Sequence, residues 1–173
     1  TKYGAAYYYH KVSDEKKKEG YVGLKNLGCI CYMNSSLQQF FMVPSLRFGL
    51  LRFDDGEEEN PCPTHNGLDD NLFHQPQKLF SYLQLSERMD YNPFGFTFAF
   101  KDFEGQPTRI SEQKDAQEFL SIFFDRMENS CKKTKYKYLI QNIFGGKNCS
   151  QIKCQDCHKI KNRFEEITMK RMF

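Results

Sequence analysis

The residues in this chain with the most useful chemistry are its cysteines, and Cys31 has the most informative surroundings. Apolar residues recur at helical spacing after it and predict a helix from about Cys31 until Pro44 stops it. The unpaired N–H groups and partial positive charge of a helix N-terminus favour a thiolate, which is the attacking species. Asn26, five residues upstream, could add an amide donor for an oxyanion. A small, packed cysteine is the competing interpretation of Cys31.

A second chemical motif is the pair Cys154 and Cys157, which has the Cys-x-x-Cys spacing of a zinc knuckle. A structural zinc site needs four ligands, and the pair supplies two. His158 directly follows Cys157 and cannot easily share one tetrahedron with it. We therefore expect either half of a zinc ribbon or two unligated thiols. The odd total of seven cysteines, widely scattered, argues against a disulfide framework.

The elements that would position these groups are mainly helices. A helix with Pro76 in its first turn should end near Asn92 and Pro93. A helix capped by Ser111 is predicted from apolar residues at intervals of three and four, namely Ala116, Phe119, Leu120, Phe123 and Met127. A strand is expected from Arg163 to Phe173. Residues 1–20 look like an extension or linker, and residues 54–71 look like an acidic surface loop.

Composition bounds the remaining function classes. The chain is 39% hydrophobic and 27% charged, which is typical of a folded domain, and its net charge is +3. Its lysine runs accompany no recognised nucleic-acid motif, so nucleic acid is not an expected partner. No apolar run is long enough for a membrane span and no cleavable secretory signal opens the chain, so we expect an intracellular protein, cytoplasmic and possibly nuclear. Nothing in the sequence indicates an oligomeric state.

The segment from Gly23 to Gln38, GLKNLGCICYMNSSLQ, closely resembles the cysteine box of the ubiquitin-specific proteases. The resemblance implies that Cys31, and not Cys29, is the catalytic nucleophile, and that Asn26 assists the oxyanion. One residue departs from the family pattern, since Ile30 stands where threonine is usual. A local hydrogen bond would be lost there without obvious loss of chemistry.

Two further segments extend this resemblance over about residues 21–173. EQKDAQEFL, from Glu112 to Leu120, looks like the family's Gln-Asp-Ala-Gln-Glu-Phe box, which implies that Asp115, Gln117 and Glu118 face the channel for the basic ubiquitin tail. Phe144-Gly145-Gly146, followed by Cys154 and Cys157, resembles the entry into the family's fingers subdomain. In that family a second cysteine pair lies further along the chain.

The resemblance implies an α+β, papain-like cysteine protease fold. A helical thumb would span residues 21–138, and the start of an antiparallel fingers sheet with half a zinc ribbon would span residues 139–173. The family's catalytic histidine comes late, so we expect the chain to stop before the palm histidine and to be inactive or weakly active alone. The implied function is a thiol-dependent deubiquitinase acting on ubiquitin and ubiquitinated proteins, with no catalytic cofactor. The alternative is a ubiquitin-binding module without turnover.

Overall fold

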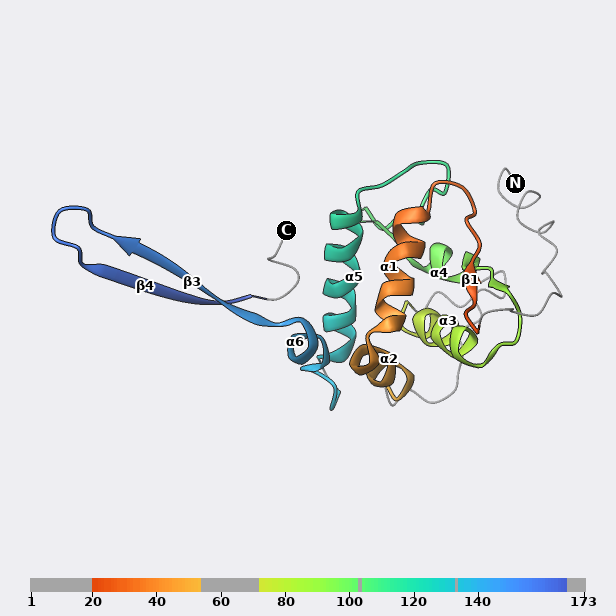
Figure 1. Ribbon diagram of the computed structural model, residues 1–173. Coiled ribbons are helices and arrows are strands. Elements are labelled where there is room, and N and C mark those ends of the chain that lie inside the picture. The colour runs from red at the N-terminus through yellow and green to blue at the C-terminus, as the bar shows by residue number, and fades with distance from the viewer. Residues whose placement is uncertain (1–19, 54–71, 103, 133, 168–173) are drawn as a thin grey trace.

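The computed structural model describes residues 20–53, 72–102, 104–132 and 134–167. A helical body is followed by a long two-stranded hairpin that projects from it (Figure 1). This mixture of helices and strands agrees with the predicted α+β class. The described elements, in chain order, are β1 (Gly23–Leu24), α1 (Cys31–Met42), α2 (Pro44–Leu51), α3 (His74–Leu85), β2 (Asp90–Tyr91), α4 (Phe94–Ala99), α5 (Ala116–Cys131), α6 (Leu139–Phe144), β3 (Gly146–Lys153) and β4 (Ile160–Ile167).

The centre of the core includes phenyl rings on α1 and α5, which lie side by side (Figure 1). Phe40 of α1 stacks on Phe123 of α5 with ring centroids 5.3 Å apart, and it meets Phe124 edge-on at 5.2 Å. Such aromatic pairs add specific geometry to ordinary apolar burial. The contacts fix the relative placement of the two helices and therefore of the residues at their N-termini.

The prediction for α1 is confirmed, since the helix begins at Cys31 and ends at Met42, just before Pro44. The predicted start of the next well-patterned helix is wrong. α5 begins at Ala116 rather than near Ser111, because the side chain of Asp115 accepts hydrogen bonds from the first-turn N–H groups and caps the helix.

The predicted end of the Pro76 helix is also wrong. α3 ends at Leu85, because Ser86 is extended and the chain then forms β2. β2 pairs in parallel with β1, with Gly23 opposite Asp90 and Leu24 opposite Tyr91. Sequence patterns hid this end, since two-residue strands leave no periodic signal.

The hairpin is an antiparallel pair in which Cys149 lies opposite Phe164 and Lys153 opposite Ile160. β4 therefore begins at Ile160, three residues earlier than the predicted start at Arg163. The hairpin follows α6, which ends at Phe144 and contacts α2 and α5. Among the described helices, none has both the length and the apolar character needed to cross a bilayer.

Parts of the predicted organisation lie outside the described residues. These are positions 1–19 of the extension, the acidic segment 54–71, and positions 168–173 of the strand expected up to Phe173. The predicted boundary between a thumb ending at residue 138 and a fingers subdomain beginning at residue 139 stays a prediction.

Candidate functional site

Cys31 is the first residue of α1, and its side chain is exposed. Ile30 occupies the N-cap position and makes no side-chain hydrogen bond to the first turn. It is instead fully buried in the core. With isoleucine in place of threonine at this position, no N-cap side chain accepts a hydrogen bond from the N–H groups of the first helical turn. These N–H groups lie next to the accessible thiol of Cys31. Such groups favour negative charge on a thiolate or on an oxyanion.

The loop before Cys31 is tied to the segment that precedes α5. Gly28 has a φ of 152°, and a Cβ added there would collide with the carbonyl oxygen of Ile110. The N–H group of Cys29 donates to that same oxygen at 2.6 Å. Glycine is thus required at position 28 both for its conformation and for the close approach of two backbones.

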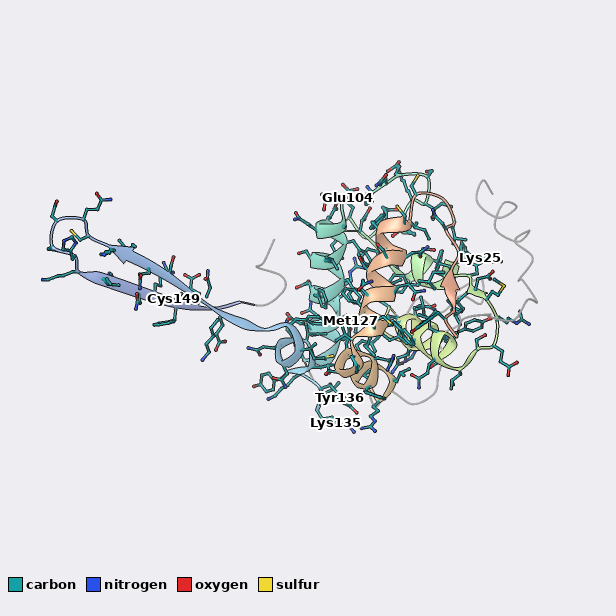
Figure 2. All side chains as sticks on the ribbon, viewed as in Figure 1. Lys25, Glu104, Met127, Lys135, Tyr136 and Cys149 are labelled. Carbon is teal, nitrogen blue, oxygen red and sulfur yellow. The ribbon has the colours of Figure 1, made fainter. Side chains whose placement is uncertain are left out.

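Asn26 lies on the exposed side of this loop. Its Oδ1 accepts a long hydrogen bond from the N–H group of Gly28 at 3.4 Å. Because Oδ1 faces the loop, the Nδ2 group of the same amide can donate a hydrogen bond to another acceptor. Just upstream, Lys25 Nζ pairs with Asp90 at 3.4 Å and the N–H group of Lys25 donates to the carbonyl of Tyr91 at 2.9 Å. Figure 2 shows Lys25 beside β1.

The second predicted group lies at the start of α5. Asp115 Oδ1 accepts from the N–H group of Gln117 at 2.6 Å and from that of Glu118 at 3.3 Å. Asp115 is therefore a helix cap, a role that its predicted place in a substrate channel did not include. Gln117 and Glu118 are exposed in the first turn of α5, where Glu118 also complements the helix dipole.

The fold brings the two motifs together, because α1 and α5 begin at the same end of the helical body (Figure 1). Tyr32 and Phe119 meet edge-on with ring centroids 5.7 Å apart. Burial of Tyr32, followed by the charges of Glu118 and Cys31, raises the pKa of the Tyr32 phenol to about 12. Glu118 is thus close enough to act electrostatically on the residue beside Cys31.

A cavity of about 350 Å³ opens at this end of the molecule, between the start of α5 and residues 100–114. Four of the side chains that line it are carboxylates and two are basic, so acidic groups predominate. Figure 2 shows one of them, Glu104, near the start of α5. The lining residues are Tyr32, Phe100, Asp102, Glu104, Gln106, Thr108, Arg109, Glu112, Lys114, Glu118, Phe119 and Ile122.

Cys154 and Cys157 lie at the turn between β3 and β4, far from α1 (Figure 1). Hydrogen bonds from the backbone of Cys157 and of Asp156, and from the thiol of Cys157, hold the pKa of Cys154 below its usual value. Backbone donors around a sulfur suit a metal-bound thiolate, so the pair fits half of a tetrahedral zinc site. Within the described residues, no cluster of three or more His, Cys, Asp or Glu side chains could hold a metal.

The two histidines that the structure describes lie elsewhere. His158 follows the cysteine pair in the hairpin turn, with a φ of 56°. His74 begins α3 and lines a separate groove with Tyr82 and Tyr91. The base that a thiol nucleophile requires is therefore not identified among these two residues.

Sequence reasoning missed the residues that hold the loop in place. Ile110 contributes only a backbone oxygen, and no sequence signal could have singled it out. The Lys25–Asp90 pair joins the residue after β1 to β2, two segments far apart in the chain. The sequence motifs identified the candidate reactive residues. They did not indicate the contacts that hold these residues in place.

Comparison with known proteins shows which family and which relatives the chain resembles. Residues 22–170 match the family model described as ubiquitin carboxyl-terminal hydrolase. The chain is 37% identical over 144 residues to ubiquitin carboxyl-terminal hydrolase 24 of Mus musculus, covering 83% of this chain and 5% of the relative. It is 34% identical over 152 residues to ubiquitin carboxyl-terminal hydrolase 7 of Drosophila melanogaster, covering 88% of this chain and 12% of the relative.

The chain thus spans only a small part of the length of the relatives it matches. The match to the family model, in contrast, covers most of the residues of this chain. The matched range includes the cysteine loop, both helix starts and the hairpin. The chain therefore belongs to the ubiquitin carboxyl-terminal hydrolase family.

Proposed function

We propose that this chain carries the nucleophile of a deubiquitinase, and that Cys31 is that nucleophile. The observation that carries the proposal is the exposed thiol at the first residue of α1, next to first-turn N–H groups that no side chain caps. Family membership supports the same assignment, because the matched range includes this loop. Cys29, two residues earlier, precedes the helix and has a less exposed side chain.

In the proposed reaction, the Cys31 thiolate attacks the carbonyl carbon of the C-terminal glycine residue of ubiquitin. The negative charge that develops on the carbonyl oxygen would be stabilised by first-turn N–H groups and by Asn26 Nδ2. The amine leaves after accepting a proton, and water then hydrolyses the thioester at Cys31 to release free ubiquitin. We propose that a histidine outside the described residues takes the thiol proton and supplies it to the amine.

The acidic start of α5 would receive the basic tail of ubiquitin. Glu118 and the neighbouring carboxylates of the cavity give this end of the molecule a complementary charge. Asp115 would contribute mainly by holding the first turn of α5, since one of its oxygens already accepts two backbone hydrogen bonds. Gln117 is exposed in the same turn and can donate to a passing peptide.

We also propose that Cys154 and Cys157 supply half of a structural zinc site at the tip of the hairpin. The support is the lowered pKa of Cys154 and the backbone donors around its sulfur. Metal binding requires deprotonated thiols, so this environment lowers the cost of forming the site. Zinc would have no part in the reaction at Cys31, because α1 lies in the helical body, away from the turn of the hairpin (Figure 1).

The test uses ubiquitin whose C-terminus carries a thiol-reactive electrophile, incubated with the full-length protein and followed by intact mass. The expected result is one covalent adduct, localised to Cys31 by peptide mapping and abolished by Cys31→Ala. Cys29→Ala is the matched control, because it removes a thiol from the same loop and should leave the adduct intact. Tight ubiquitin binding without an adduct would instead favour a binding module. An adduct that survives Cys31→Ala would contradict the assignment of the nucleophile.

A further inference from the structure

We propose that Asn34 is a positioning residue, which holds the loop that carries Asn26 at the correct place relative to Cys31. This inference rests on the proposed function, because it concerns how the oxyanion donor is oriented. Asn34 lies one helical turn after Cys31 on α1. Residues three apart on a helix share a face, so Asn34 lies below the thiol on the same side of the helix.

The contact that carries the inference is a hydrogen bond from Asn34 Nδ2 to the carbonyl oxygen of Lys25, at 3.0 Å. That carbonyl belongs to the peptide group that joins Lys25 to Asn26. A peptide group is planar, so fixing its oxygen also fixes the direction in which the chain enters Asn26. A single side chain of the nucleophile's helix thus sets the orientation of the proposed oxyanion donor.

Burial makes this hydrogen bond hard to replace. Asn34 is only 9% exposed, and within the described part of the chain its Oδ1 has no hydrogen-bond partner. Nδ2 is the donor of this bond, because the opposite orientation of the amide would place Oδ1 against another acceptor, the Lys25 oxygen. A buried, unpaired oxygen is unfavourable, and an apolar residue would fill this position better if packing were its only role. The presence of an asparagine at this buried position is therefore explained by its hydrogen bond to the carbonyl oxygen of Lys25.

The Asn34 bond lies between two other anchors of the loop. Upstream, the backbone is paired to β2 as far as the N–H group of Lys25. Downstream, the next backbone anchor is the bond from Cys29 to Ile110. Between them lie the Asn34 bond and the long bond between Asn26 and Gly28, while Leu27 packs against the core. The Asn34 bond directly opposes rotation of the peptide between Lys25 and Asn26.

α1 also supplies a matched control. Gln38, one turn further along the helix, donates through Nε2 to the carbonyl oxygen of Val22 at 2.9 Å. It makes the same kind of bond to the same backbone segment, but it acts before β1 rather than next to Asn26. Gln38→Leu should therefore disturb the segment and leave the orientation of Asn26 nearly unchanged.

The experiment measures kcat and KM of the full-length protein on ubiquitin with a fluorogenic C-terminal amide, for Asn34→Leu and Gln38→Leu. Each change is made alone and also in the Asn26→Ala background. We expect Asn34→Leu to lower kcat by about tenfold or more with KM nearly unchanged, and Gln38→Leu to lower kcat by less than about threefold. In the Asn26→Ala background, Asn34→Leu should lower kcat by less than about twofold further, because the donor it positions is absent.

Thermal denaturation of each variant establishes that it is folded at the assay temperature. If Asn34→Leu does not fold, Asn34→Ala replaces it, since the smaller side chain cannot overpack the site and the same pattern is expected. Equal losses of kcat for the Asn34 and Gln38 variants, or an undiminished loss in the Asn26→Ala background, would overturn the positioning role alone. A wild-type protein that neither hydrolyses the substrate nor reacts at Cys31 would overturn both this inference and the proposed function.

Discussion

Replacing Gly28 by alanine should disrupt the cysteine loop more than its small size suggests. Gly28 has a φ of 152°, a backbone angle that residues with a side chain rarely adopt. A Cβ atom at this position would also collide with the carbonyl oxygen of Ile110. Backbone strain of this kind costs about 1–3 kcal/mol. Moving the loop to relieve the collision would also break the 2.6 Å bond from Cys29 to Ile110, a net loss of about 0.5–1.5 kcal/mol.

Together these effects should lower the free energy of unfolding by about 3 kcal/mol. For a domain of this size, that corresponds to a fall in Tm of roughly 6–12 °C. Because Cys29 is two residues from Cys31, the displaced loop should also slow the reaction of Cys31 with electrophilic ubiquitin, by about tenfold for each 1.4 kcal/mol of lost transition-state stabilisation. Urea denaturation and adduct formation followed over time measure the two effects.

Gly105→Ala is the matched control for this prediction. Gly105 also has a positive φ, 77°, but a Cβ added there would meet no atom within 4 Å. It should show the cost of backbone strain, about 1–2 kcal/mol, without the collision or the lost hydrogen bond. If Gly28→Ala destabilises the protein no more than Gly105→Ala, and Cys31 reacts at the wild-type rate, the reasoning about this loop is wrong.

Three other substitutions test separate parts of the structure. Asp115→Ala should lower the free energy of unfolding by about 1 kcal/mol through loss of the α5 cap, measured by urea denaturation. Tyr32→Phe should remove a loss of stability between pH 10 and about pH 12, because the unfolded phenol ionises there while the folded phenol stays protonated. Adding cobalt(II) should produce a thiolate-to-metal absorption band that disappears in Cys154→Ser.

Each of these has an outcome that would contradict it. Asp115→Asn should retain most of the stability, since asparagine also caps helices, and equal losses for the two Asp115 variants would argue against the capping role. The pH dependence attributed to Tyr32 is absent if the wild type and Tyr32→Phe show parallel stability curves above pH 10. A cobalt band of unchanged intensity in Cys154→Ser would remove that sulfur from the metal site.

The candidate site residues could be named from the chain because they lie in two contiguous segments. The loop from Asn26 to Cys31 and the helix that follows it depend on local glycine and apolar patterning, and α1 begins where that pattern predicts. The segment from Asp115 to Glu118 was recognised by its resemblance to the family's Gln-Asp-Ala-Gln-Glu-Phe box. Its helix start was misplaced, because Ser111 and Asp115 are both acceptable caps and only the folded backbone selects between them.

Tertiary structure alone decided how these pieces meet. Packing of phenyl rings between α1 and α5 brings Cys31 and Glu118 to one end of the body. The oxygen of Ile110 and the amide of Asn34 then hold the intervening loop through contacts that bridge separate segments. Such contacts leave no periodic trace in a single sequence, because they depend on distances between segments rather than on spacing within one.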